Sequence, residues 1–354
     1  MPGPDPTSSA ETEFIEDLDR DVARAIAGHV ATFTELGDDV LRFSSVAEQF
    51  VAGGKRFRAS FVRAGWLVAG GVDRAEPMMQ AAAAIELLQG SALVHDDLMD
   101  GSDTRRGRPS VHREFEARHR EAGRVGDPAD FGRSAAVLMG DLLLSISNQE
   151  LVAAAGRIDP AARDRAIRLY DLCKVEVTAG QFLDVVAATH AEISVDDALK
   201  VATYKSAKYT VERPLQIGAA LAGADDALLA GLSAVALPLG VAFQLRDDVL
   251  GVFGDPEVTG KPAGDDLREG KRTVLVARAL EHADEGQRTA LTQTLGTDDV
   301  DTARGVIEAT GAREAVEADI ARLEDESDAA IAALGPDAVA VLRPLALRAT
   351  RRAR

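Results

Sequence analysis

The amino-acid sequence predicts an all-α protein, and three observations carry this prediction. Aromatic residues make up only 4% of the 354 residues, while alanine and leucine are abundant. Apolar residues recur at the spacing of one face of an α-helix over long stretches of the chain. The alternation of polar and β-branched residues that is typical of a β-strand is scarce.

The individual helices are predicted from caps and from periodic apolar residues. The first helix is expected to begin near Ser9, because Ser8-Ser9-Ala10-Glu11 has the spacing of a capping box. Apolar residues then recur one turn apart on a single helical face, at Phe14, Leu18, Val22 and Ile26. Further helices are expected over residues 38–51, 56–68, 76–99, 131–155, 160–187, 195–222, 226–253 and 273–283, followed by three more toward Arg354.

The chain is expected to consist of a short tail and a single domain. Residues 1–8 are polar and rich in proline, without the basic and apolar regions of a signal peptide, so they are predicted to be a flexible tail. No Ser- or Pro-rich linker divides residues 9–354, and the long apolar helices favour one large bundle around a central active-site cavity. The longest uninterrupted apolar stretches, such as 234–243, are shorter than the roughly 20 residues of a membrane span.

Charge and cysteine content exclude several classes of function. The formal net charge of −18 would repel a nucleic-acid backbone, so nucleic acid is not an expected partner. Cys173 is the one cysteine, which rules out a disulfide within the chain and a zinc site built from cysteines. A reducing cytoplasm is the expected location.

Two pairs of adjacent aspartates follow two apolar helical stretches. The first pair is Asp96-Asp97, and Asp100 lies one helical turn after Asp96 on the same face. The second pair, Asp247-Asp248, follows Gln244 after the second stretch. Carboxylates this close repel one another, and the negative end of a helix increases the repulsion. The pattern therefore predicts a bound cation. Mg²⁺ prefers such oxygen ligands, with water and substrate phosphates completing its shell.

Clusters of basic residues, four of which contain glycine, supply a positive field for an anion. Each cluster alone is typical of a solvated surface, but together they outline an anion site beside a metal site. The clusters are Gly53-Gly54-Lys55-Arg56-Phe57-Arg58, Arg105-Arg106-Gly107-Arg108, Lys205-Ser206-Ala207-Lys208, Gly260-Lys261-Pro262 and Gly270-Lys271-Arg272.

In order and spacing, these segments resemble the trans-isoprenyl diphosphate synthases, the polyprenyl synthetase family, and most of all its bacterial geranylgeranyl diphosphate synthases. The match spans about 55–271. The resemblance implies an isoprenoid synthase fold and a Mg²⁺-dependent prenyltransferase, with about three ions per active site. It implies condensation of isopentenyl diphosphate with dimethylallyl, geranyl or farnesyl diphosphate to an all-trans product, in a homodimer. Class I terpene cyclases share the first aspartate motif but lack the second.

The resemblance also implies a role for each matching residue. The metal ligands correspond to Asp96, Asp100 and Asp247, with Asp97 and Asp248 in support. The allylic diphosphate is expected to be held by Arg105, Lys205, Lys261 and Lys271, beside the cavity-lining Gln181 and Asp184. Isopentenyl diphosphate corresponds to Lys55, Arg58, Gln89 and Arg106. The catalytic set is Lys205, Ser206, Gln244 and Arg105, in which Ser206 and Gln244 direct oxygen dipoles at the carbocation.

The second motif departs from the fuller family pattern, because Gly251 stands where a third aspartate is expected. Asp255 or Asp266 could supply that support through water. On the helix that ends at Asp96, the small residues Ser91 and Ala92 leave space for a growing chain, and Leu88 lies one turn further down. A twenty-carbon product, geranylgeranyl diphosphate, is therefore expected, with farnesyl or longer products as alternatives.

Other interpretations of the same residues are weaker. Residues 264–271 resemble a phosphate-binding P-loop only superficially, because five residues separate the glycines and no strand precedes them. His95 and His112 lack the spacing of a zinc pair, and His95 is interpreted as a helix-end or structural histidine. Cys173 is interpreted as a core residue, and Tyr204 and Tyr209 as residues that only pack. A non-catalytic partner subunit of a prenyl synthase is the alternative class. Such a subunit should have lost metal-binding or cationic residues, which are all present here.

Overall fold

The structure is a computed structural model that describes residues 6–254 and 264–350. Lys261, Asp255 and the first five residues of the expected tail lie outside this part of the chain. The helices are α1 (Pro6–Thr34), α2 (Asp38–Val51), α3 (Phe57–Val68), α4 (Glu76–Met99), α5 (Val111–Glu121), α6 (Pro128–Ala155), α7 (Pro160–Ala188), α8 (Val195–Val201), the π-helix η1 (Ala202–Glu212), α9 (Arg213–Leu221), α10 (Asp226–Phe253), α12 (Asp265–Arg268), α13 (Val274–His282), α14 (Glu285–Thr294), α15 (Val300–Ala309), α16 (Ala312–Ala333) and α17 (Pro336–Thr350).

The all-α prediction is confirmed, with local differences. The first helix begins at Pro6 rather than near Ser9, which places a proline at a position where its missing N–H costs nothing. Residues 111–121, which lie between two of the expected helices, form α5, and four helices rather than three follow α13. The only strands in the described residues are β1 (Thr104–Arg105) and β2 (Arg108–Pro109), an antiparallel pair in which Arg105 faces Arg108.

The helix expected over 195–222 is divided into α8, η1 and α9. The central part is a π-helix, a wider form that often marks functional sites. Helix propensity does not distinguish this form from an α-helix. Gly180 of α7 and Gly240 of α10 face η1, and a side chain at either glycine would overlap its backbone, at Lys205 and Ala207 respectively.

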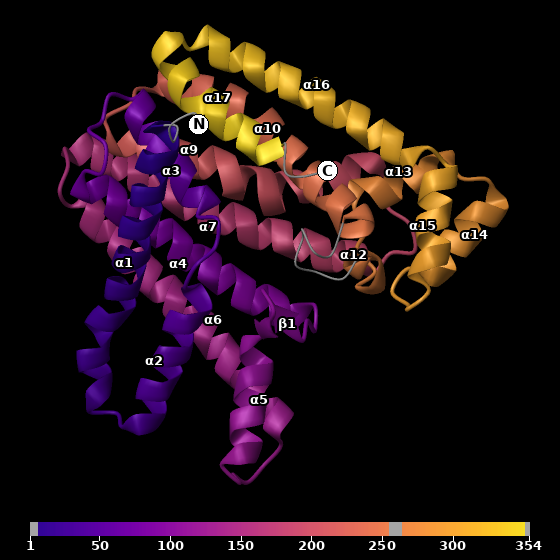
Figure 1. The fold of residues 1–354 in the computed structure, drawn as a ribbon, viewed down its shortest axis with the longest axis horizontal. Coiled ribbons are helices and arrows are strands. Elements are labelled where there is room, and N and C mark those ends of the chain that lie inside the picture. Colours follow the sequence, from indigo (N-terminus) through magenta and orange to yellow (C-terminus); the bar gives the residue numbers. More distant parts are fainter. Residues whose placement is uncertain (1–5, 255–263, 351–354) are drawn as a thin grey trace, which may run out of the picture.

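The helices form a bundle in which α10 packs against η1 on one side and α16 on the other, while α4 packs along α6 (Figure 1). The α2 and α5 helices extend from the lower side of this body in the same view. Three clusters of buried apolar residues fill the bundle, and the largest joins α1, α4, α6 and α7. The aspartates of α4 and α10 thus stand at the ends of helices anchored in the core.

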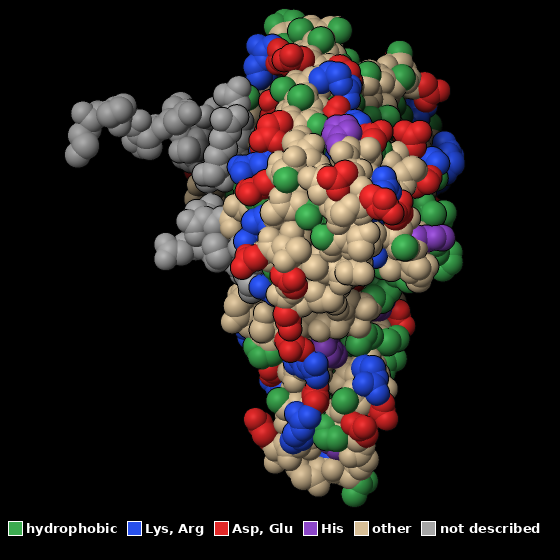
Figure 2. Space-filling model, turned by 90° about the vertical axis from the view of Figure 1, so that its right-hand side faces the viewer, with side chains coloured by type: hydrophobic (Ala, Val, Ile, Leu, Met, Phe, Trp, Pro, Cys, Tyr) green, Lys and Arg blue, Asp and Glu red, His purple; other side chains and the backbone are tan. Residues whose placement is uncertain are grey.

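The α10 helix is long and apolar enough to cross a membrane by length and composition, and half of its most apolar window is buried within the bundle. Burial of this kind is typical of a core helix. On the surface, basic and acidic side chains are interspersed over the face shown in Figure 2 rather than gathered by sign. The charge of −18 is therefore not concentrated on this face.

A close helix crossing joins α3 and α9, and it gives a test of the fold. A side chain at Gly218 would overlap the Val62 carbonyl, and one at Gly65 would overlap the Leu215 carbonyl. Gly218→Ala is expected to lower the free energy of unfolding by about 1–3 kcal/mol, because the two backbones must separate.

Gly305→Ala is the matched control, since Gly305 is exposed in α15 with open space around it. That substitution should stabilise the helix by up to about 1 kcal/mol. Thermal unfolding of both variants checks the prediction, and an unchanged melting temperature for Gly218→Ala would contradict the close crossing.

Candidate active site

The first aspartate motif lies at the end of α4, where its members have different surroundings. The Asp96 carboxylate accepts hydrogen bonds from Gln181 Nε2 at 3.1 Å and Lys205 Nζ at 3.3 Å, and Arg105 Nη2 lies 3.7 Å away. Burial alone would raise the pKa of Asp96, but the charges of Lys205, Lys271 and Arg105 outweigh it and lower the pKa. Asp96 is thus held as a carboxylate at the centre of the site.

Asp97 faces away from that centre. It is 1% exposed, and its Oδ1 accepts hydrogen bonds from Arg105, at 2.7 Å from Nε and also from Nη2. Its Oδ2 is buried without a hydrogen-bond partner. This geometry fits the expected supporting role, because Asp97 holds the Arg105 guanidinium beside Asp96.

The second motif lies on α10. Gln244 Nε2 donates to Asp248 Oδ1 at 2.7 Å. Burial, reinforced by the negative charges of Asp266, Asp247 and Asp184, raises the pKa of Asp248 to about 8. Carboxylates from α7, α10 and α12 therefore share one electrostatic environment.

At Gly251, where the family pattern has a third aspartate, the carboxylate of Asp266 from another helix fills the space. A side chain at Gly251 would overlap the carboxylate of Asp266, and Gly264 N–H donates to the Gly251 carbonyl at 2.9 Å. The start of α12 is thus pinned to the end of α10, with the Asp266 carboxylate over the glycine. An acidic group from a different helix occupies the space that a longer residue 251 would need.

Lysines connect the two acidic groups. Lys271 Nζ lies 3.2 Å from Asp100, 3.7 Å from Asp266 and 2.5 Å from Glu269. Lys205 Nζ lies 2.5 Å from Asp184 and donates to Asp96 as well. Although burial disfavours the charged form of Lys205, Asp96 and Asp184 raise its pKa, so the ammonium remains charged.

A second group of cations comes from the loop before α3 and from the turn between β1 and β2. Arg106 Nη1 donates to the Gly53 carbonyl at 3.3 Å, and Gly54, at φ 107°, lets its backbone lie against the same guanidinium. Lys55 follows in this loop and is exposed. Partial desolvation and the positive charge of Arg56 lower the pKa of Arg106, so an anion is favoured here.

Arg58 and Gln89 complete this second group through contacts with η1. Arg58 Nη2 donates to Thr210 Oγ1 at 2.9 Å, and its guanidinium carbon lies 4.6 Å from the centre of the Tyr209 ring. The Tyr209 hydroxyl donates to Gln89 Oε1 at 2.7 Å. The interpretation of Tyr209 as a residue that only packs is therefore too narrow, and no sequence spacing indicated its contact with Gln89.

Arg56 is a further residue that the sequence analysis left without a role. It is 4% exposed in a left-handed conformation, at φ 47°. Its guanidinium donates to Glu86 at 3.1 Å, to Asp19 at 2.7 Å and to the Val51 carbonyl at 2.9 Å. These contacts fix the loop that carries Lys55, and the start of α3 that carries Arg58, against α1 and α4.

The acidic residues offer only oxygen donors, which fits Mg²⁺ rather than a softer metal. Among residues 6–254 and 264–350, no three His, Cys, Asp or Glu side chains converge tightly enough to hold an ion by themselves. Lys205 and Lys271 instead pair with the carboxylates. Because Mg²⁺ in such sites takes several ligands from water and substrate phosphates, the carboxylates need not surround the ion by themselves to fit the metal.

The expected chain-length residues lie on α4 below Asp96. Ala92 is half-buried, while Ser91 and Leu88 are 3% and 4% exposed. His95 lies on another side of α4, where its Nε2 is 3.3 Å from the Val137 carbonyl of α6. This contact agrees with a structural role for His95.

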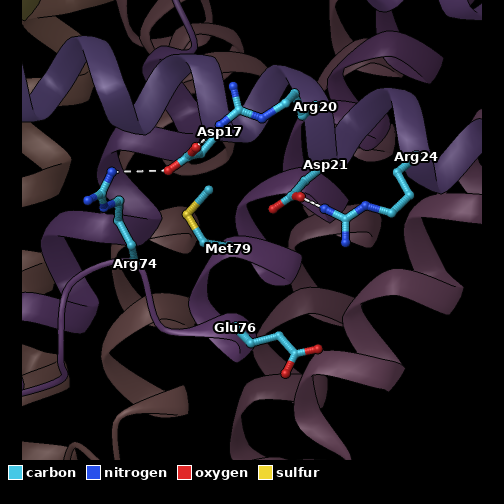
Figure 3. A pocket seen from close by; sticks show the side chains of 7 residues that line it. All are labelled: Asp17, Arg20, Asp21, Arg24, Arg74, Glu76 and Met79. Atoms are coloured by element: carbon cyan, nitrogen blue, oxygen red, sulfur yellow. Dashed lines mark hydrogen bonds and ion pairs between the residues drawn. The ribbon is translucent and has the colours of Figure 1, made fainter.

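A pocket at the start of α4, the end opposite to the aspartate motif, has a different chemistry. This pocket of about 380 Å³ lies between α1 and the start of α4. Figure 3 shows the side chains that line it, which are Asp17, Arg20, Asp21, Arg24, Arg74, Glu76 and Met79. Its charged side chains pair with one another, as Arg74 does with Asp17 at 3.1 Å. It lacks the aspartate motifs, so the site at the ends of α4 and α10 is the candidate active site.

An all-α bundle with facing aspartate motifs on two core helices is the architecture of isoprenyl synthases, and comparisons with known proteins agree. The model of the polyprenyl synthetase family matches residues 41–310. A geranylgeranyl diphosphate synthase of Mycobacterium tuberculosis is 38% identical over 293 residues, covering 81% of this chain and 76% of that protein. A short-chain isoprenyl diphosphate synthase of Methanocaldococcus jannaschii is 30% identical over 284 residues, covering 80% of this chain and 79% of the relative.

Comparison with solved structures indicates the same family. A geranylgeranyl pyrophosphate synthase from Corynebacterium glutamicum, crystallised with isoprenyl diphosphate and magnesium, is similar with a TM-score of 0.91 and 39% identity, covering 96% of this chain and 99% of that one. The chain belongs to the polyprenyl synthetase family. It is a prenyltransferase with the all-α fold of that family.

Proposed function

We propose that this protein condenses isopentenyl diphosphate head-to-tail with allylic diphosphates, in a Mg²⁺-dependent reaction whose main product is geranylgeranyl diphosphate. The observation that carries the proposal is the pairing of two sites. Aspartates of α4 and α10 share the field of Lys205 and Lys271, and a separate group of cations lies around Arg58 and Arg106. The reaction needs two diphosphate sites of this kind side by side.

The acidic site would bind the allylic substrate. Asp96, Asp100 and Asp247 would hold Mg²⁺, which neutralises the diphosphate and stabilises it as a leaving group. Arg105, Lys205, Lys271 and Lys261 would share the charge that develops as the carbon–oxygen bond breaks. Asp97 would act through Arg105 and Asp248 through Gln244, to which each is hydrogen-bonded, and Asp266 would support the metal site through water.

The second site would bind isopentenyl diphosphate at Lys55, Arg58, Gln89 and Arg106. Its double bond attacks the allylic cation, forming the new carbon–carbon bond, and a proton is then lost to the departed diphosphate. The Lys205 carbonyl, Ser206 and Gln244 would stabilise the cation. Ser206 is buried on the π-helix directly after Lys205, which supports its place beside the reacting carbons.

The proposed product length depends on α4. Ala92 and Ser91 are small and stand one turn below Asp96, while Leu88 lies about 12 Å below it along the helix. Each helical turn of about 5.4 Å is close to the length of one isoprene unit. This spacing favours a twenty-carbon product over farnesyl diphosphate, and the names of the mycobacterial and corynebacterial relatives support it.

We further propose a cytoplasmic homodimer formed by one domain per chain, without a membrane span. Exposed large apolar side chains are frequent on the neighbouring helices α6 and α7, at Val137, Leu138, Val152, Leu172, Val175 and Phe182. Apolar surface of this kind is typical of a protein interface. The burial of α10 within the bundle supports its place in the core rather than in a membrane.

The alternative class, a non-catalytic partner subunit, should have lost metal-binding or cationic residues. The structure brings the cationic and acidic residues of both sites together in the described part of the chain, which favours the enzyme. Purified protein with Mg²⁺, labelled isopentenyl diphosphate and each allylic primer in turn tests the proposal. Chromatography of the products should give mainly a twenty-carbon chain, and complete lack of turnover would overturn the proposal.

The metal assignment predicts a large loss of turnover from single carboxylate removals. Asp96→Ala or Asp247→Ala is expected to lower kcat by at least ~10²-fold, because a main electrostatic stabiliser of the leaving group is lost. Circular dichroism should show an intact fold. A variant that keeps near-normal turnover in saturating Mg²⁺ would show that its carboxylate does not bind the metal.

The two-site assignment predicts a selective effect on one substrate. Lys55→Ala should raise KM for isopentenyl diphosphate by at least ~10-fold and leave KM for the allylic primer nearly unchanged, because Lys55 belongs to one site only. Steady-state kinetics with each substrate varied in turn measures both constants. Equal increases would mean that the two sites are merged or exchanged.

The chain-length assignment predicts opposite changes at two positions of α4. Ser91→Phe should shorten the main product, because the ring fills the space below Asp96, and Leu88→Ala should lengthen it by about one isoprene unit. Leu291→Ala is the control, because it removes the same volume from a fully buried position in α14. If both α4 variants return the parental product distribution, this helix does not set the length.

A further inference from the structure

Tyr209 links two residues of the proposed isopentenyl diphosphate site. Its side chain is 4% exposed, and its hydroxyl donates to Gln89 Oε1 at 2.7 Å across the gap between η1 and α4. Arg58 of α3 lies over the same ring, with the guanidinium carbon 4.6 Å from the ring centre. One side chain of the π-helix therefore contacts functional residues from two other helices.

The hydrogen bond determines how the Gln89 amide is oriented. A carboxamide has an oxygen on one side and a donor NH₂ group on the other. With the oxygen held by Tyr209, the NH₂ group is directed away from the ring. Burial raises the pKa of Tyr209 above its usual value, so the hydroxyl stays protonated and remains a donor. A donor amide is the form that can bind a diphosphate oxygen.

Arg58 is fixed by the same helix. The Tyr209 ring supports its guanidinium, and Thr210 Oγ1 accepts a hydrogen bond from Nη2 at 2.9 Å. Arg58 Nε is buried without a hydrogen-bond partner in the structure. Tyr209 and Thr210 thus hold this long side chain without satisfying all of its donors.

We propose that Tyr209 is a positioning residue for isopentenyl diphosphate, which orients the Gln89 amide and supports the Arg58 guanidinium so that both present donors to the diphosphate. This inference rests on the proposed function, because that function assigns Gln89 and Arg58 to this substrate. Tyr209 itself acts only through these two residues.

The competing explanation is that Tyr209 stabilises the core, since it belongs to the largest buried cluster. Tyr209→Phe separates the two, because the ring and its packing remain while the hydroxyl is removed. We expect KM for isopentenyl diphosphate to rise about 3- to 10-fold, the loss of one buried hydrogen bond, with KM for the allylic primer and kcat nearly unchanged.

Two other tyrosines provide matched controls. Tyr170 is equally buried, and its hydroxyl lies 2.5 Å from Ser147 Oγ, so Tyr170→Phe also removes a buried hydrogen bond. Tyr204 is exposed on the same π-helix as Tyr209. Tyr170→Phe is expected to lower the melting temperature without changing either KM, and Tyr204→Phe should change none of these quantities.

The connection through Gln89 is tested by a double-mutant cycle. In a Gln89→Leu background, Tyr209→Phe should raise KM for isopentenyl diphosphate no further, because the amide that it orients is gone. An independent, multiplicative rise would overturn the proposal. So would a Tyr209→Phe variant that behaves like Tyr170→Phe, with a lower melting temperature and unchanged KM values.

The experiments also distinguish a wrong assignment of the isopentenyl diphosphate site from a wrong role for Tyr209. If Gln89→Leu and Lys55→Ala both leave KM for isopentenyl diphosphate unchanged in an active enzyme, the substrate site is elsewhere, and the proposal about Tyr209 fails with it. If Gln89→Leu and Lys55→Ala raise KM for isopentenyl diphosphate while Tyr209→Phe does not, the assignment of the substrate site is supported and only the inference about Tyr209 is wrong.

Discussion

The close approach of η1 to α7 and α10 is the constraint on which the site depends. Gly180 and Gly240 have no side chain, so the backbone of η1 lies directly against both helices. Only at this separation can Lys205 reach Asp184 of α7 and Asp96 of α4, at 2.5 and 3.3 Å. The same helix carries Tyr209 to Gln89, so one packing contact arranges residues of both proposed substrate sites.

Electrostatics explains why a strongly acidic chain can be built to bind diphosphates. The net charge of −18 belongs to the whole protein, whereas a site responds to the charges within a few ångströms of it. Lys205 and Lys271 lie among the carboxylates, and Arg56, Arg58 and Arg105 lie near Arg106. The acidic residues thus place oxygen donors where the proposed metal would bind, and the cations beside them place N–H donors where the proposed diphosphates would bind.

Much of this arrangement could be predicted from the sequence, because its signals are local. Two of these signals are the spacing of Asp96 and Asp100 on a helix and the glycines beside basic residues. Each indicates a binding group formed by residues within one or two helical turns of one another. The π-helix, the contact of Tyr209 with Gln89, and Asp266 lying over Gly251 could not be predicted in the same way. Each depends on residues far apart in the chain that meet only after the helices pack, and helix periodicity does not specify that packing.

Gly251 shows how such a long-range contact changes the interpretation of a motif. By sequence alone, the glycine is a loss from the second aspartate motif. In the structure, it is the position that lets the Asp266 carboxylate come within the field of Asp248. The backbone hydrogen bond from Gly264 to Gly251 fixes this approach, and Lys271 follows Asp266 closely enough to reach Asp100 at 3.2 Å. Aspartate motifs of related proteins are therefore better compared by the charged groups that the fold brings together than by the residues at matching positions of the sequence.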